Sequence, residues 1–203
     1  MALCDYLISS DIQGYDCERP MIKGAQAIGR LVNRADINFA TTDASMDGQP
    51  FQVLFSNEHA LKCGKKGYTV YQSGKQPFNG TQQEMVEGVY RNTITNTLQL
   101  VVLRQDADFA KQLFALINGE FVAVMLNKNG TYQVYGYETG LHCTGAVREL
   151  YNDDTLSGWL ITFTEEGAAK GNIFTDATSF LDLLAKGACE HSPMTKDEAL
   201  AND

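Results

Sequence analysis

The 203-residue sequence lacks the segments that mark several large protein classes. Its longest clean apolar stretch, residues 121–126, has the length of a strand, so no membrane-spanning helix of about 18 residues is expected. The first residues have no basic segment and reach Asp5 at once, which is not typical of a secretory signal. Hydrophobic residues make up 44% and charged residues 20%, which is ordinary for a folded domain with a sizeable core.

Motifs for nucleotide and hydrolytic chemistry are also absent. Residues 63–65 and 73–75 each contain a Gly-Lys pair, but both lack the first glycine of a G-x-x-x-x-G-K phosphate loop. The sequence has no G-x-G-x-x-G, no G-x-S-x-G nucleophile elbow and no H-E-x-x-H zinc motif. We therefore predict a protein that is not an enzyme and that has no catalytic residues, no cofactor and no bound metal.

Cysteine is too scarce for a disulfide-stabilised scaffold. Five cysteines are spread along the chain: Cys4, Cys17, Cys63, Cys143 and Cys189. The odd count and the missing secretory signal predict free thiols in a reducing compartment.

Two thiol-based sites are conceivable, and neither is favoured. His142, Cys143, Cys189 and His191 could supply four zinc donors, but the adjacent pair would point to opposite faces of a strand. A nucleophile at Cys63 with His59 as its base would need this segment to be helical. Buried or tolerated thiols are the simpler interpretation of both patterns.

Paired carboxylates are the third candidate for chemistry. Asp153-Asp154 and Glu165-Glu166 are adjacent in sequence, so on a strand the two members of each pair diverge. Glycoside hydrolysis needs two carboxylates that face one cleft, usually beside aromatic platforms, and only one tryptophan is available. Turn solvation and strand-end charge explain these pairs better.

Charge is distributed unevenly along the chain, whose net charge is −9. Residues 59–83 contain four lysines and no acid, whereas residues 151–203 have a net charge of −7. The overall acidity argues against duplex DNA as a tightly held partner. The two segments could meet across a subunit interface, or they could be two solvated faces of one subunit.

The hydrophobic pattern predicts an α+β fold dominated by an antiparallel sheet, either a β-sandwich or barrel-like, with one central helix and a short C-terminal helix. The run at 121–126 is apolar on both faces, which predicts a central strand covered on both sides. A long strand with one wet side, bent or turned near Asn96, is expected within 89–103. An Asn129-Gly130 turn is expected to lead from 121–126 into a hairpin partner at 132–137. Further expected strands lie at 24–33, after Gly67, and in a hairpin of 144–150 with 158–165, and a long hairpin loop is expected between 37–40 and 51–55.

Two helices have start signals. Asp106 is expected to cap a helix over 106–117 that buries Ala110, Leu113, Phe114 and Ile117 and ends at Asn118-Gly119. Asp176 is expected to open a short helix with Ala177, Phe180, Leu181 and Leu184 on one face, which Gly187 stops. With no composition break visible, we predict one domain over 1–190, with an irregular leader at about 1–22 and a polar tail at 191–203.

An aromatic group offers one further possibility for function. Tyr132, Tyr135, Tyr137, Tyr151 and Trp159 could stack a sugar or line a protein contact. Ordinary cross-strand pairing is the favoured interpretation. A ligand- or glycan-binding β-module without catalysis remains the alternative function, and a groove near Tyr135 and Tyr137 would be its signature.

The order of strand, single helix and hairpin-paired strands over 84–167 resembles that of bacteriophage tail-tube and tail-ring proteins. The segments that match are Leu98–Leu103, Asp108–Phe114, Phe121–Leu126, Tyr132–Tyr137 and Gly158–Gly167. The opening, with Cys4 to Cys17 before Lys23-Gly24 and the Asn33–Ile37 segment, is similar to virion proteins of phages of gut Bacteroidetes-type bacteria, such as the crAss-like group.

This resemblance implies a structural virion protein with no catalytic residues. Its subunits would associate laterally into a homo-oligomeric ring, a hexamer or higher, and rings would stack into a tail or neck conduit for DNA. The implied partners are other copies of the chain, other virion proteins and DNA in transient passage, with no membrane. The implied location is the virion, assembled in the host cytoplasm. An acidic lumen suits this role, because fixed cationic contacts would hold DNA in place.

Overall fold

The computed structural model describes residues 22–44, 49, 51–56, 59–72, 74–104, 106–150 and 158–189. The expected C-terminal tail and all but the last residue of the expected leader lie outside the described residues. None of the described helices has the length and hydropathy that crossing a bilayer requires.

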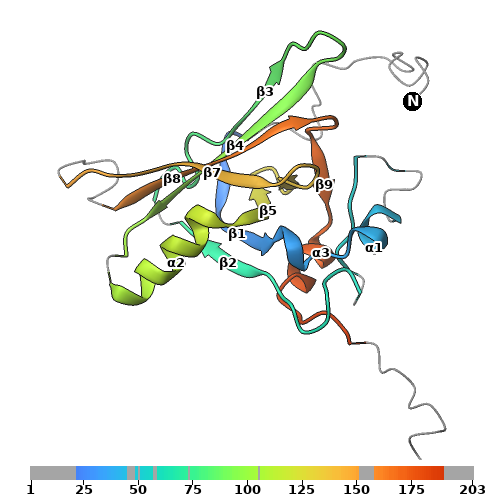
Figure 1. The fold of residues 1–203 in the computed structure, drawn as a ribbon, viewed down its shortest axis with the longest axis horizontal. Coiled ribbons are helices and arrows are strands. Elements are labelled where there is room, and N and C mark those ends of the chain that lie inside the picture. Colours follow the sequence, from blue (N-terminus) through green and yellow to red (C-terminus); the bar gives the residue numbers. More distant parts are fainter. Residues whose placement is uncertain are drawn as a thin grey trace, which may run out of the picture.

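In the part of the chain that the structure describes, nine strands form one continuous sheet in which every strand pairing is antiparallel (Figure 1). The main path runs in the order β2 (Tyr68–Tyr71), β1 (Ala25–Asn33), β5 (Glu120–Asn127), β7 (Leu141–Arg148), β8 (Trp159–Ala168), β4 (Thr93–Val102) and β3 (Gln82–Val86). Two strands lie off this path, since β6 (Tyr132–Tyr135) pairs with β5 and β9 (Ile173–Thr175) pairs with β6.

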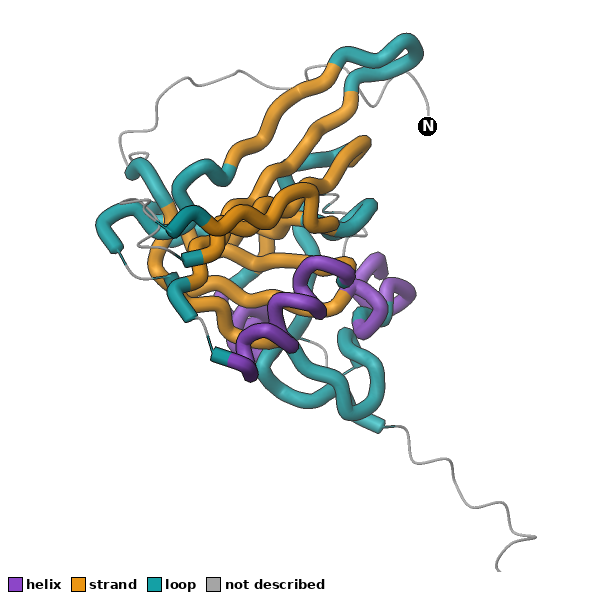
Figure 2. Tube along the Cα trace, turned by 60° about the vertical axis from the view of Figure 1, so that its left-hand side comes forward, coloured by secondary structure: helices purple, strands orange, loops and turns teal. Residues whose placement is uncertain are grey.

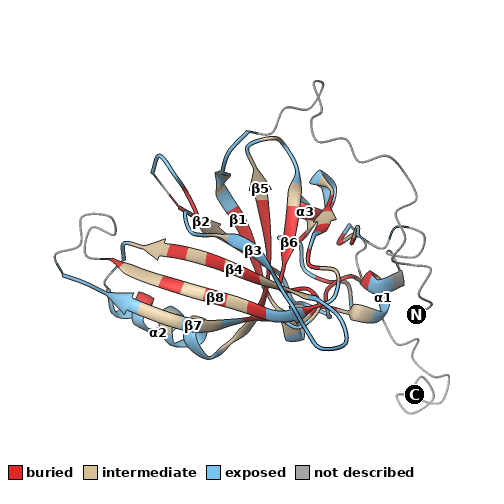
Figure 3. Cartoon of the chain, turned by 90° about the horizontal axis from the view of Figure 1, so that it is seen from above, coloured by how far each residue is buried: buried red, intermediate tan, exposed pale blue. Residues whose placement is uncertain are grey.

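The sheet divides at β5. One edge of this strand pairs with β1, while the other pairs first with β7 and then with β6. Viewed from above, β7, β8 and β4 run across the direction of β1, β5 and β6 (Figure 3). The expected α+β class with a dominant antiparallel sheet is confirmed, but a single branched sheet takes the place of two separate sheets of a sandwich.

The core lies on both faces of β5, as the two-sided apolar run predicts. Residues 121–125 are all buried. Val122 and Val124 belong to one hydrophobic cluster, with Val32, Phe55 and Leu183. The alternate side chains belong to a second cluster, which joins β5 to β4 and β8: Phe121, Ala123, Met125, Leu98, Leu100, Ile161 and Phe163.

Both predicted helix starts are confirmed. Helix α2 (Ala107–Asn118) is capped by Asp106, whose carboxylate accepts a 2.7 Å hydrogen bond from the backbone N–H of Phe109. Helix α3 (Ala177–Asp182) is capped by Asp176, which accepts a 2.6 Å bond from Ser179 N–H. These bonds satisfy N–H groups that have no partner within the helix.

The predicted buried face of α2 is wrong in part. Phe109 is buried and Leu113 and Leu116 are partly buried, whereas Phe114 is 72% and Ile117 40% exposed. Both apolar stripes satisfy the helical period, so periodicity alone could not choose between them. Likewise, Leu183 is the leucine buried just after α3, while Leu181 and Leu184 are exposed, since α3 ends before the periodic run does.

The predicted hairpin between 37–40 and 51–55 is also wrong. Residues Phe39–Ala44 form helix α1, after a 3-10 turn η2 (Arg34–Asp36), and Gln52 makes only an isolated parallel bridge to Phe174. Strand β3 was not expected, because none of its residues is buried and its sequence has no apolar alternation. The expected irregularity near Asn96 is confirmed as a register shift between Ile94 and Asn96 in the pairing of β4 with β8.

Candidate functional site

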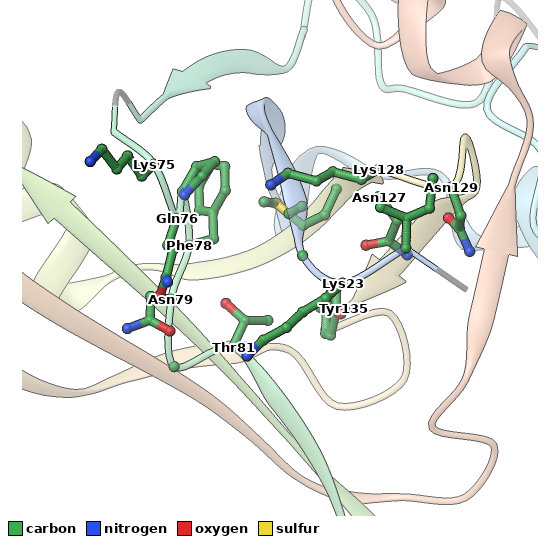
Figure 4. A pocket seen from close by; sticks show the side chains of 16 residues that line it. Lys23, Lys75, Gln76, Phe78, Asn79, Thr81, Asn127, Lys128, Asn129 and Tyr135 are labelled. Carbon is green, nitrogen blue, oxygen red and sulfur yellow. The ribbon is translucent and has the colours of Figure 1, made fainter. Parts of the chain in front are cut away.

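The main hollow of the described structure is a pocket of about 680 Å³ beside the start of β1. Its walls are the segment 22–25, the β2–β3 connection at 75–81, and the end of β5 with the β5–β6 turn at 127–129. Met125 and Tyr135 complete its lining. Figure 4 shows these three segments around the opening, with polar side chains from each of them.

The wall at 75–81 is held by a buried phenyl ring. Phe78 is only 3% exposed and packs in the second core cluster, although its φ of 56° is in the left-handed region. Gly80 follows with a φ of 89°, and a Cβ there would clash with the side chain of Gln99. Left-handed backbone at a non-glycine residue costs about 1 kcal/mol or more and is enriched at binding sites.

The opposite wall is the Asn-Gly turn that the sequence predicts between β5 and β6. Gly130 has a φ of 84°, and Asn129 Oδ1 accepts hydrogen bonds from the backbone and hydroxyl groups of Thr131. The backbone N–H of Lys128 donates to Gly24 O at 2.9 Å, which joins this turn to the start of β1. Two walls of the pocket are therefore fixed to each other by main-chain bonding.

The pocket is cationic in an otherwise acidic protein. Lys23, Lys75 and Lys128 line it, and no acidic residue does. None of the three ammonium groups makes an ion pair within the described part of the chain. In Figure 4, Lys128 and Lys23 reach towards the opening from different walls, whereas Lys75 lies at the rim.

Behind the pocket, a chain of side-chain amides runs into the protein. Tyr135 OH donates to Gln133 Oε1 at 3.0 Å, and Asn127 Nδ2 donates to the same oxygen at 3.2 Å. Gln133 Nε2 in turn donates to Gln83 and Asn172 at 2.9 and 2.8 Å. Burial raises the pKa of Tyr135 to about 12, so its hydroxyl stays a donor at neutral pH.

The same network reaches a buried carboxylate. Glu165, 2% exposed, accepts bonds from Asn96 Nδ2 and Gly136 N–H at 2.7 Å, and from Glu138 and Thr139 N–H at 3.1 Å. These four donors compensate for lost hydration and fix the 136–139 turn on β8. Its neighbour Glu166 is exposed, so the expected divergence of this pair is confirmed, but the expectation that both are solvated strand-end charges is wrong for Glu165. Asp153-Asp154 lie outside the described residues.

A second hollow of about 450 Å³ lies beside Tyr137, and three of its charged side chains, Arg34, Asp43 and Glu138, have hydrogen-bond partners. Tyr137 OH donates a hydrogen bond to Asp43 at 2.6 Å. Burial is the larger cause that raises the pKa of this phenol, and the bond to Asp43 raises it further. Arg34 bonds Glu138 O at 2.9 Å and lies over the Phe39 ring at 4.8 Å. This arrangement is typical of a structural contact.

The tyrosines that the sequence suggested as one binding surface lie in different parts of the structure. Tyr135 and Tyr137 are both buried, so their rings pack mainly in the core, yet each also lines one of the two hollows. Tyr132 packs against Phe180 at a ring-centroid distance of 5.1 Å. Tyr151 lies outside the described residues.

The prediction that all thiols are free is wrong. Cys63 and Cys189 form a disulfide across 126 residues of sequence, and the chain segments beside them pair through Cys63 and Gly187. This bond removes Cys63 as a nucleophile and Cys189 as a zinc ligand. Residues 59–60 are not helical, so His59 and Cys63 do not share the helix face that a nucleophile and its base would need there. Cys143 is free and half-buried.

Metal donors do not gather in the described residues, where no three His, Cys, Asp or Glu side chains come together. His142 faces Glu120, with 3.7 Å between Nε2 and Oε1, and His191 lies outside the described residues.

The most exposed apolar feature is the β3–β4 hairpin, which projects from the body of the protein (Figures 1 and 2). All five residues of β3 are exposed, and it is an edge strand. At the tip, Val89 is 94% and Tyr90 100% exposed, and Met85 and Val86 continue the apolar surface. Sequence reasoning placed Val89 and Tyr90 in a long strand and missed the projection.

Comparisons with known proteins give no further guide to function, since no protein-family model, curated protein or solved structure matches the chain significantly.

Proposed function

We propose that this protein is a non-catalytic structural subunit of a bacteriophage virion. It associates with copies of itself into a ring or tube segment of the tail or neck, through which DNA passes. Its partners are the neighbouring copies and other virion proteins, and a hexamer or larger ring is expected.

The observation that supports this proposal most is the projecting hairpin. Exposed apolar side chains at Val89 and Tyr90 lose contact with water only if another surface covers them. An unpaired edge strand with such a tip offers a surface for association, and Glu84 is the one charged side chain among the five residues of β3.

The shape of the hairpin favours a head-to-tail contact. When the projection of one subunit packs on a different surface of its neighbour and no two-fold axis relates the two subunits, the interface is heterologous. Heterologous contacts form rings when the rotation between neighbours closes. The exposed Phe114 and Ile117 on α2 give further apolar surface for such packing.

Charge and the disulfide are compatible with the same role. Lys62 and Lys66 are exposed, and the sequence of 151–203 has a net charge of −7, so segments of opposite charge are available for contacts between subunits. A net charge of −9 suits a channel that must not retain DNA. The Cys63–Cys189 bond would persist in a virion released into an oxidising medium.

The test is a pair of matched surface variants. Val89→Ser with Tyr90→Ser removes the apolar tip, whereas Leu181→Ser removes a leucine that is 62% exposed on α3. Light scattering after size exclusion should show a large oligomer for the wild type and L181S, and a monomer with unchanged thermal stability for the tip variant. Assembly of the tip variant at the wild-type level would contradict the role of the hairpin.

A second candidate function is a ligand-binding β-module, which the pocket lined by Tyr135 favours. Its polar walls come from three separate segments, two of which are joined by main-chain bonding, as expected for a preformed site. This function does not exclude assembly, because the hairpin tip is not part of the pocket.

A further inference from the structure

We propose that the lysine-lined pocket binds an acidic oligosaccharide, with Lys23 and Lys128 holding its anionic groups. This inference deepens the second candidate function, and it is independent of ring assembly.

Charge is the first support for this inference. Lys23 and Lys128 project from different walls of one pocket, and neither meets a carboxylate in the described part of the chain (Figure 4). The two ammonium groups repel each other while the pocket is empty, and a bound anion attracts both of them.

The remaining polar groups match hydroxyl-rich ligands. Asn127 Nδ2 donates hydrogen bonds to Gln133 and Thr131, while Asn127 Oδ1 accepts no hydrogen bond from the described residues. Gln76 and Asn79 are exposed at the opposite wall and make no side-chain hydrogen bond within the described residues. Amides both donate and accept, so they suit sugar hydroxyl groups, which do the same.

The apolar part of the lining forms a fixed floor. Phe78 and Tyr135 line the pocket but are only 3% and 6% exposed, so they present little ring surface and serve mainly to anchor the walls in the core. The left-handed backbone at Phe78 and the hydrogen bond of Tyr135 to Gln133 hold this floor in place before any ligand arrives. Preorganised groups bind with less loss of conformational entropy.

Size favours a short oligosaccharide over a polymer. The volume of about 680 Å³ lies within the range of about 300–1,000 Å³ that is usual for small-molecule sites. Duplex DNA needs an extended basic surface, and a chain of net charge −9 with one local cluster of lysines does not supply it.

Titration calorimetry of the full chain tests the inference with four probes: trigalacturonate, a trisulfated disaccharide, neutral maltotriose and tetra-aspartate. Binding of either acidic sugar, at least about tenfold tighter than maltotriose, is the expected result, and the two acidic sugars distinguish carboxylate from sulfate as the anionic group. Raising salt from about 50 mM to about 500 mM should weaken this binding, because exposed charges are screened.

Variants then locate the site. K23A/K128A should lose at least about tenfold in affinity for the acidic sugar, whereas K111A/K186A, with the same charge change on exposed lysines outside the pocket, should bind as the wild type does. Equal weakening by both pairs would overturn the inference, because it would indicate a diffuse charge effect.

The other outcomes distinguish this inference from the second candidate function, on which it rests. Binding of maltotriose alone would refute the anionic ligand while leaving the binding module intact. Tighter binding of tetra-aspartate would assign the pocket to an acidic peptide and overturn the sugar. No binding by any probe would refute both the inference and the second candidate function, and ring assembly would be unaffected.

Discussion

Asn96 on β4 donates a 2.7 Å hydrogen bond to the buried carboxylate of Glu165 on β8, where the pairing of these two strands shifts register. The side-chain oxygen of Asn96, Oδ1, accepts a hydrogen bond from Gln83 Nε2 on β3 at 2.8 Å. This pair therefore links the base of the projecting hairpin to the turn that Glu165 holds. It also continues the amide network that begins at the pocket.

The first prediction concerns Glu165. In Glu165→Gln an amide NH₂ replaces one oxygen, and it must then face N–H donors that the carboxylate had accepted. Unsatisfied buried donors should cost about 2–4 kcal/mol in the free energy of unfolding, measured by urea denaturation. Glu166→Gln, at the exposed neighbour, is the control and should unfold like the wild type. Equal stability of the two variants would contradict the account of the carboxylate.

A second prediction separates two core positions that the sequence pattern treats alike. Phe163 is fully buried and meets Phe121 edge-on at 5.8 Å, whereas Leu113 is only partly buried. Phe163→Ala should destabilise the protein by about 3–5 kcal/mol, and Leu113→Ala by about 1 kcal/mol. Chemical denaturation of both variants checks the difference, and a larger loss for Leu113→Ala would show that α2 packs differently.

The third prediction concerns the disulfide. Peptide mapping without reductant should find Cys63 and Cys189 in one linked pair, which separates on reduction. Replacing both by serine should lower the free energy of unfolding by about 2–4 kcal/mol, because the bond closes a long loop. Cys143→Ser, at the free thiol, is the control for loss of a cysteine. Full alkylation of Cys63 and Cys189 without reductant would refute the bond.

The fourth prediction concerns the rims of neighbouring subunits. Lys65 already pairs with Asp36 at 3.6 Å, so Lys62 and Lys66 are better placed to meet an acidic neighbour. K62E/K66E should slow assembly at low salt and leave the subunit folded, whereas Lys111→Glu on α2 is the control. Time-resolved light scattering measures the rate. An unchanged rate at about 50 mM salt would remove these lysines from the interface.

The sequence predicts elements whose signals are local. The two-sided run at 121–126, the Asp106 cap and the Asn129-Gly130 turn each determine their own conformation, and the structure agrees with all three. The α2 face was misassigned because Phe114 and Ile117 satisfy the helical period as well as Phe109 and Leu116 do, and only tertiary packing decides between them.

The pocket and the disulfide depend on contacts between distant segments. Lys23, Lys75 and Lys128 each lie in a segment that looks like an ordinary loop, and only the sheet brings these segments together. Cys63 and Cys189 are likewise 126 residues apart, and sequence alone does not determine such a pairing.

The central claim is that copies of this chain assemble into rings, and negative-stain electron microscopy of the purified full-length protein tests it most directly. We expect closed rings of uniform diameter with a central opening, at protein concentrations where V89S/Y90S gives only single subunits. Images of the wild-type protein that show only single subunits at high protein concentration would contradict the claim.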